Sequence, residues 1–163
     1  MVEVWLRGLP VEYDPLRHLL LCTLEQTREE VRGRLEGLAD EQVWARPGGL
    51  TPIGFHVRHI GESIDRLLTY AEGRQLSEQQ LAVLKEELSN ELSAVELLGL
   101  LESQLDEAKR RVIAMAGADL SGVREIGRRK IEVPLGTLLA HIAEHTQRYL
   151  GQLATTTKLL GAR

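Results

Sequence analysis

The sequence predicts an all-α protein, a four-helix bundle with long connections. Apolar residues recur every three or four positions over four long stretches of the 163-residue chain, and proline and glycine fall mostly between these stretches. The composition, 43% hydrophobic and 27% charged, is close to that of an average globular protein. We therefore expect residues 1–163 to form a single domain with its own core.

The first two long helices each begin with the same signal. Residues 15–36 follow Asp14, a good N-cap, and start with a proline at the first helical position. Thr51 is likewise followed by a proline, and it opens a second helix that runs to Glu72, where a glycine ends the pattern. Both helices should present an apolar stripe to a common core.

The second half of the chain contains a less regular segment between two further helices. Ser77 is expected to cap a short helix, and a third long helix, opened by Ser93 or its neighbours, should run from Val95 to about Met115. Residues 117–133 are the least helical and are expected to form a short hairpin or an extended loop. Pro134 then opens a fourth long helix to about residue 160. The long connections, 37–50 and 117–133, leave room for crossovers.

Charge and cysteine content exclude several classes of protein. A net charge of −4 and a pI near 5.8 argue against a nucleic-acid-binding surface. No apolar run reaches the roughly 18–20 residues that a membrane-spanning helix needs. The single Cys22 makes no internal disulfide, which fits a reducing compartment. We expect a cytoplasmic protein without a nucleic-acid or membrane partner.

Four of the five histidines form two close pairs on two predicted helices. His141 and His145 are four residues apart and share a helix face, and His56 and His59 are three apart. On helical wheels both pairs lie at the border of the apolar stripe. If the two helices are neighbours, three imidazoles converge, and they suit a divalent metal ion. Three other polar residues share these faces and are candidates to hydrogen-bond an imidazole or a substrate. They are Ser63, Tyr70 and Gln152.

Other polar residues leave alternatives open. Either histidine pair alone is a weak signal, because such pairs are common on half-exposed helix faces. His18 and Cys22 lie one turn apart and form a conceivable second ligand pair, although a core position is the commoner role. Glu62 and Glu144 are either partners of the histidines or solvated carboxylates. The basic run 128–130 could bind an anion, but such runs usually lie in solvated loops.

Two segments resemble the metal motifs of the DinB-like superfamily. Residues 51–60, Thr-Pro-Ile-Gly-Phe-His-Val-Arg-His-Ile, are similar to its first motif, and residues 141–152, His-Ile-Ala-Glu-His-Thr-Gln-Arg-Tyr-Leu-Gly-Gln, to its second. The resemblance implies a four-helix bundle that binds zinc or nickel through three histidines. The matching ligand positions are His59, His141 and His145.

The resemblance also assigns roles to neighbouring residues. His56 would lie beside the ligands or on the open side of the metal. Many relatives carry a further histidine where this chain has Tyr149, which is most simply a core aromatic.

The superfamily includes enzymes that transfer low-molecular-weight thiols to electrophiles. The resemblance therefore implies a metal-dependent enzyme, a thiol S-transferase or hydrolase, that activates a small thiol or water for a small-molecule substrate. A homodimer is expected, since long amphipathic helices often leave an apolar stripe uncovered. Two alternatives are open: a non-catalytic dimeric stress-response or interaction module with a structural metal, or the same module with none.

Overall fold

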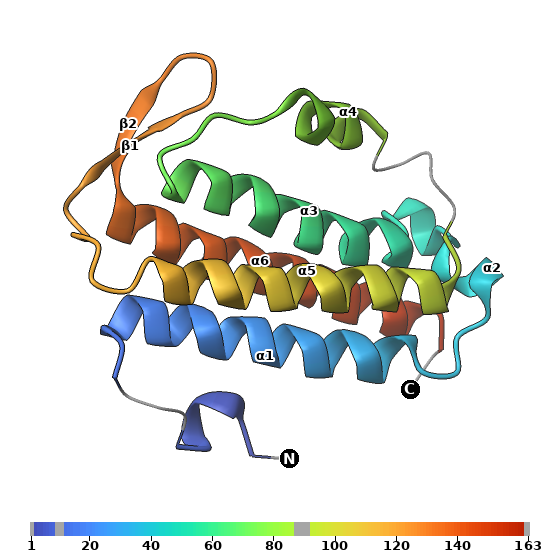
Figure 1. The fold of residues 1–163 in the computed structure, drawn as a ribbon. Coiled ribbons are helices and arrows are strands. Elements are labelled where there is room, and N and C mark those ends of the chain that lie inside the picture. Colours follow the sequence, from blue (N-terminus) through green and yellow to red (C-terminus); the bar gives the residue numbers. More distant parts are fainter. Residues whose placement is uncertain (1, 9–11, 87–91, 162–163) are drawn as a thin grey trace.

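Four long helices form the body of the protein in a computed structural model that describes residues 2–8, 12–86 and 92–161 (Figure 1). The long helices are α1 (Pro15–Leu35), α3 (Ile53–Ala71), α5 (Ala94–Ala114) and α6 (Leu135–Leu159). The shorter elements are η1 (Val4–Leu6), α2 (Asp40–Val43), η2 (Pro47–Gly49), α4 (Glu78–Glu86), β1 (Val123–Ile126) and β2 (Ile131–Pro134). The predicted all-α bundle is confirmed. No helix in the described ranges is long and apolar enough to cross a membrane.

The long helices are not arranged in simple up-and-down order. Helix α1 packs mainly against α5 and α6, and α3 packs mainly against the same two helices. Helices α1 and α3 therefore lie diagonally across the bundle. The segment that contains α4 returns the chain to the end where α3 begins, so α3 and α5 run parallel, while α3 and α6 run antiparallel (Figure 1). The crossover therefore lies between α3 and α5, whereas the connections that were expected to hold crossovers, 37–50 and 117–133, join helices that lie diagonally opposite one another. Helices α3 and α6 are neighbours.

The helix starts follow from local capping. The Asp14 carboxylate accepts hydrogen bonds from backbone N–H groups in the first turn of α1. Ser93 and Glu96 form a reciprocal capping box at the start of α5. Helix α3 differs from the prediction: its N-cap is Pro52, in extended conformation, and Thr51 lies one residue outside the helix.

The segment between α5 and α6 is a hairpin, one of the two forms expected. Strands β1 and β2 pair antiparallel, with Arg124 opposite Val133. The basic run 128–130 lies in the hairpin turn at one end of the bundle (Figure 1). Arg128 lines a surface cavity together with residues of α4. This places the basic run beside α4 rather than beside the histidines.

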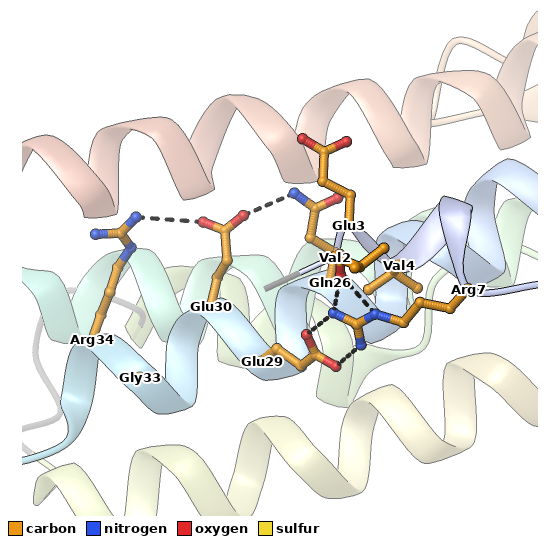
Figure 2. A pocket seen from close by; sticks show the side chains of 9 residues that line it. All are labelled: Val2, Glu3, Val4, Arg7, Gln26, Glu29, Glu30, Gly33 and Arg34. Carbon is orange, nitrogen blue, oxygen red and sulfur yellow. Dashed lines mark hydrogen bonds and ion pairs between the residues drawn. The ribbon is translucent and has the colours of Figure 1, made fainter.

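The N-terminal segment packs along α1. Val4 is buried, and the Arg7 guanidinium faces the carboxylate of Glu29, with 2.9 Å between Nη2 and Oε2 (Figure 2). A cavity of about 360 Å³ lies between this segment and α1. Its other charged side chains also have partners: Glu30 contacts Gln26 and Arg34, and Glu3 accepts from the Trp5 indole. We interpret this cavity as a packing feature of the N-terminal segment.

Close packing fixes the start of α3, the helix that carries two histidines. A Cβ atom at Gly54 would lie 2.8 Å from the indole ring of Trp44. That ring is held in place, since its Nε1–H donates to the Leu92 carbonyl at 2.7 Å. Gly54 therefore lets the α2 region lie directly against α3.

Replacing Gly54 with alanine is expected to destabilise the protein by about 1–3 kcal/mol, because the rigid indole must move. The matched control is Gly33→Ala on α1, where an added Cβ meets nothing within 4 Å. That change should leave the stability equal or raise it by about 0.5–1 kcal/mol. Urea unfolding of both variants checks this, and equal midpoints would contradict it.

Candidate metal centre

The antiparallel packing of α3 against α6 brings three histidines together. The ring centroids of His59 on α3 and His145 on α6 are 5.4 Å apart. The rings of His141 and His145, one turn apart on α6, are 5.5 Å apart. His145 thus lies between the other two imidazoles, in an arrangement that draws on two helices.

Two aromatic side chains enclose this cluster. The ring of Tyr149 lies 4.2 Å from that of His59 and 4.8 Å from that of His145, measured between centroids. Phe55 stacks on His59, with centroids 5.3 Å apart and planes inclined by 22°. Tyr149 contacts the hydrophobic core, as expected, but it also forms a wall of the histidine cluster. Both aromatics restrict the positions that the His59 ring can take.

His56 occupies a buried position next to the cluster. Its side chain is 2% exposed, and its ring centroid lies 5.9 Å from that of Tyr149. Burial, with a smaller contribution from the charge of His59, lowers the pKa of His56 from 6.5 to about 4. The ring is therefore neutral at pH 7. Its Nδ1 atom is buried and has no hydrogen-bond partner in the described chain.

A carboxylate orients the outermost histidine. The His141 Nδ1 lies 3.2 Å from Oε2 of Glu144, and Arg148 forms an ion pair with the other oxygen of the same carboxylate. When Nδ1–H donates to a carboxylate, the lone pair of the imidazole is left on Nε2, where it is available to a metal. Two roles were open for Glu144, a partner of the histidines or a solvated carboxylate. The structure combines them, because Glu144 is exposed and also contacts His141.

The structure places the other sequence candidates at different distances from the cluster. The Ser63 hydroxyl donates to the Ile60 carbonyl in its own helix at 3.1 Å. Tyr70 belongs to the hydrophobic core, 11 residues and so about 16 Å along α3 from His59. Gln152 is exposed and lines a cavity beside the histidines. The structure therefore brings Gln152, but not Tyr70, to the candidate site.

The His18 and Cys22 pair lies on α1, diagonally opposite α3. The Cys22 Sγ and His18 Nδ1 atoms are 3.9 Å apart. Cys22 is buried, and burial raises the pKa of its thiol. This cysteine is accordingly a protonated packing residue at neutral pH.

The side-chain orientations bear directly on metal binding. In the described part of the chain, no three His, Cys, Asp or Glu side chains already converge on one ion position. A common ion would therefore require the rotation of at least one imidazole. The His141 side chain is 45% exposed and has room to turn.

The neutral histidines give the metal-free protein a pH dependence. Burial, followed by the charges of His59, His141 and Arg148, lowers the pKa of His145 from 6.5 to about 4, as burial does for His56. The unfolded chain binds protons at both residues near pH 6.5, but the folded chain binds them only near pH 4. Stability should therefore fall as the pH falls through this window.

We expect the metal-free protein to lose about 3 kcal/mol of unfolding free energy between pH 7 and about pH 4.5, after allowance for partial solvent screening. The variant His145→Gln should lose about half as much, since one of the two titrating groups is gone. Urea unfolding at both pH values measures the effect. The same pH dependence in both proteins would contradict this assignment.

The comparisons with known proteins concern both the fold and the family. Residues 23–153 match the DinB superfamily. Among solved structures, the chain is similar to YfiT from Bacillus subtilis, with a TM-score of 0.70, 14% identity, and coverage of 95% of this chain and 94% of that one. YfiT is described as a probable metal-dependent hydrolase with an unusual four-helix bundle topology. The comparison with curated proteins found no match. Because the superfamily match spans most of the chain and both helices that carry the histidine pairs, this protein belongs to the DinB superfamily.

Proposed function

We propose that this protein is a metal-dependent enzyme whose ligands are His59, His141 and His145 and whose metal is zinc or nickel. The spacing of the imidazoles carries the proposal. A metal–nitrogen distance of about 2.0–2.1 Å puts each ring centroid about 3.2 Å from the ion, so two tetrahedral ligands have centroids about 5.2 Å apart. The observed separations of 5.4 and 5.5 Å fit this value. Rotation of the exposed His141 ring would bring the third ligand to the ion.

The donor set favours a reactive centre. Three neutral nitrogen ligands leave a fourth position open, as in catalytic rather than structural zinc sites. When bound, such an ion supplies Lewis acidity that activates a water molecule or a small thiol. The protein itself contributes the tautomer and the orientation: Glu144 accepts from the Nδ1–H of His141 and so leaves Nε2 as its metal-binding atom, while Phe55 and Tyr149 hold the His59 ring.

The nucleophile has two candidates. The description of YfiT as a metal-dependent hydrolase supports water. The resemblance to thiol-transferring members of the superfamily supports an external low-molecular-weight thiol. The protein's own Cys22 is a poor candidate, because it is buried on α1 with a raised pKa.

The activity is tested with protein loaded with zinc or nickel. One assay uses 4-nitrophenyl acetate, a hydrolysable ester, and the other uses N-acetylcysteine with 1-chloro-2,4-dinitrobenzene, an electrophile. We expect at least one reaction to require the metal and to be lost in His145→Ala. The matched control is His18→Ala, which removes a histidine outside the cluster and should retain activity.

The outcomes separate the enzyme from its alternatives. A metal that binds through the three histidines without accelerating either reaction would favour a structural-metal module. Activity that persists in His145→Ala would also overturn the proposal. The homodimer remains a prediction, and light scattering after size-exclusion chromatography tests it.

A further inference from the structure

A cavity adjoins the histidine cluster at the end where α3 begins. Its volume is about 340 Å³, within the range of small-molecule sites. The lining residues come from the segment before α3, the first turn of α3 and the second half of α6. They are Leu50, Thr51, His56, Arg148, Gln152 and, on α6, Gly151, Thr155 and Thr156.

The cavity lining carries a single charge on a surface formed mostly by apolar atoms. Arg148 is the cation, and no acidic side chain lines the cavity. Arg148 uses Nη2 to bind Glu144, and its other N–H groups have no protein partner in the described ranges. A guanidinium has five N–H donors, so it can bind a second carboxylate while it keeps the first.

A buried polar atom also lacks a partner at this cavity. His56 lines the cavity and is 98% buried, and its Nδ1 atom makes no hydrogen bond in the described chain. An unpaired buried polar atom costs free energy. The neutral His56 ring donates to the Thr51 backbone, so Nδ1 is an acceptor and would be satisfied by a donor group of a ligand, such as a hydroxyl, rather than by its carboxylate. Arg148 and His56 thus lie on two helices that face the same space.

The cavity lies at a useful distance from the candidate metal ligands. Along α6, Arg148 lies three residues and about 4.5 Å from His145, and Gln152 lies about 10 Å from His145. A ligand anchored here would extend a few bonds before reaching the imidazoles. A small carboxylic acid of about three to five carbons spans this distance.

We propose that this cavity binds the carboxylate end of the substrate, so that the enzyme acts on small carboxylic acids whose reactive group lies a few bonds from the acid. This inference rests on the proposed function for the identity of the reactive centre. The single guanidinium, already shared with Glu144, suits a singly charged carboxylate better than a phosphate dianion.

The test compares butyrate with butyramide, two probes of nearly equal shape that differ in charge. Binding is followed by NMR titration of the metal-free protein at constant ionic strength, so that a metal cannot hold the carboxylate. We expect butyrate to bind about tenfold or more tightly than butyramide, and Arg148→Gln to remove this difference. Arg110→Gln, at an exposed arginine on α5, is the charge-matched control.

A second variant blocks the cavity without removing a charge. Gly151 lines the cavity on α6, and a Cβ there meets nothing within 4 Å, so Gly151→Leu should fill the space without straining the helix. We expect butyrate binding to be lost. Gly99→Leu, at an equally open helical glycine on α5, should bind butyrate like the parent.

Metal content, measured on the same proteins, separates this inference from the proposed function. Equal binding of butyrate and butyramide, or butyrate binding that survives Gly151→Leu, would overturn the carboxylate site even if the protein binds metal. Charge-selective binding without any metal binding would support the carboxylate site and overturn the metal-dependent function.

Discussion

Replacing His145 with alanine is expected to weaken zinc binding about a hundredfold or more, a larger effect than the 10- to 100-fold typical of an outer-shell partner. His145 lies between His59 and His141, with ring separations of 5.4 and 5.5 Å, so its loss would remove the one proposed ligand that lies close to both of the others. Competition with a chromophoric chelator measures the affinity. Circular dichroism verifies that the helices persist.

The control for this variant is His18→Ala on α1. His18 pairs with Cys22 and lies outside the three-histidine cluster, so its removal should leave zinc affinity unchanged. A loss of affinity of less than about threefold in His145→Ala would remove this residue from the site. Equal losses in both variants would point instead to a general effect on folding.

Replacing Arg111 with alanine is expected to cost about 2–4 kcal/mol of stability, since it leaves two carboxylates without their buried cation. Arg111 is 8% exposed, and it binds Asp65 at 2.6 Å, Glu72 at 2.6 Å and the Thr69 hydroxyl at 3.1 Å. These contacts tie α5 to α3, the helix that carries His59. Urea unfolding provides the measurement.

The neighbouring residue offers a matched control. Arg110 is exposed and pairs only with Glu107 on its own helix among the described residues, so Arg110→Ala should cost about 0–1 kcal/mol. A similar loss of unfolding free energy in the two variants would contradict the stabilising role of the buried Arg111 ion pairs. The variant Arg111→Ala should also raise the pKa of Glu72. Burial favours the protonated form of this carboxyl, and hydrogen bonds from Arg111 and Arg74 hold its pKa below the ordinary value.

The sequence was sufficient for features that depend on local chemistry. Asp14 and Ser93 cap their helices through their own first turns, and such contacts involve only neighbours in the chain. The pairing of histidines on one helix face likewise follows from the helical repeat. The start of α3 was misplaced by one residue because proline next to threonine fits two capping arrangements.

Other features depend on how the helices are placed along and around one another. Tyr70 and His59 share a wheel angle, but a wheel ignores the distance along the axis, and about 16 Å separates them. The contact of Tyr149 with His59 depends on which face α6 turns toward α3. The sequence of one helix does not determine that orientation. The spacing of Tyr149, four residues after His145, was the available signal. The cavity beside Gly151 likewise arises only when both helices and the segment before α3 are assembled.

The central claim is that three histidines from two helices hold one divalent ion. Elemental analysis tests it most directly, applied to protein incubated with zinc and desalted, for the parent, His18→Ala and alanine variants at His59, His141 and His145. We expect about one ion per chain in the parent and in His18→Ala, and far less in the other three, with unchanged helical content. No metal in the parent, or a metal content that is the same in all three alanine variants as in the parent, would contradict the three-histidine site.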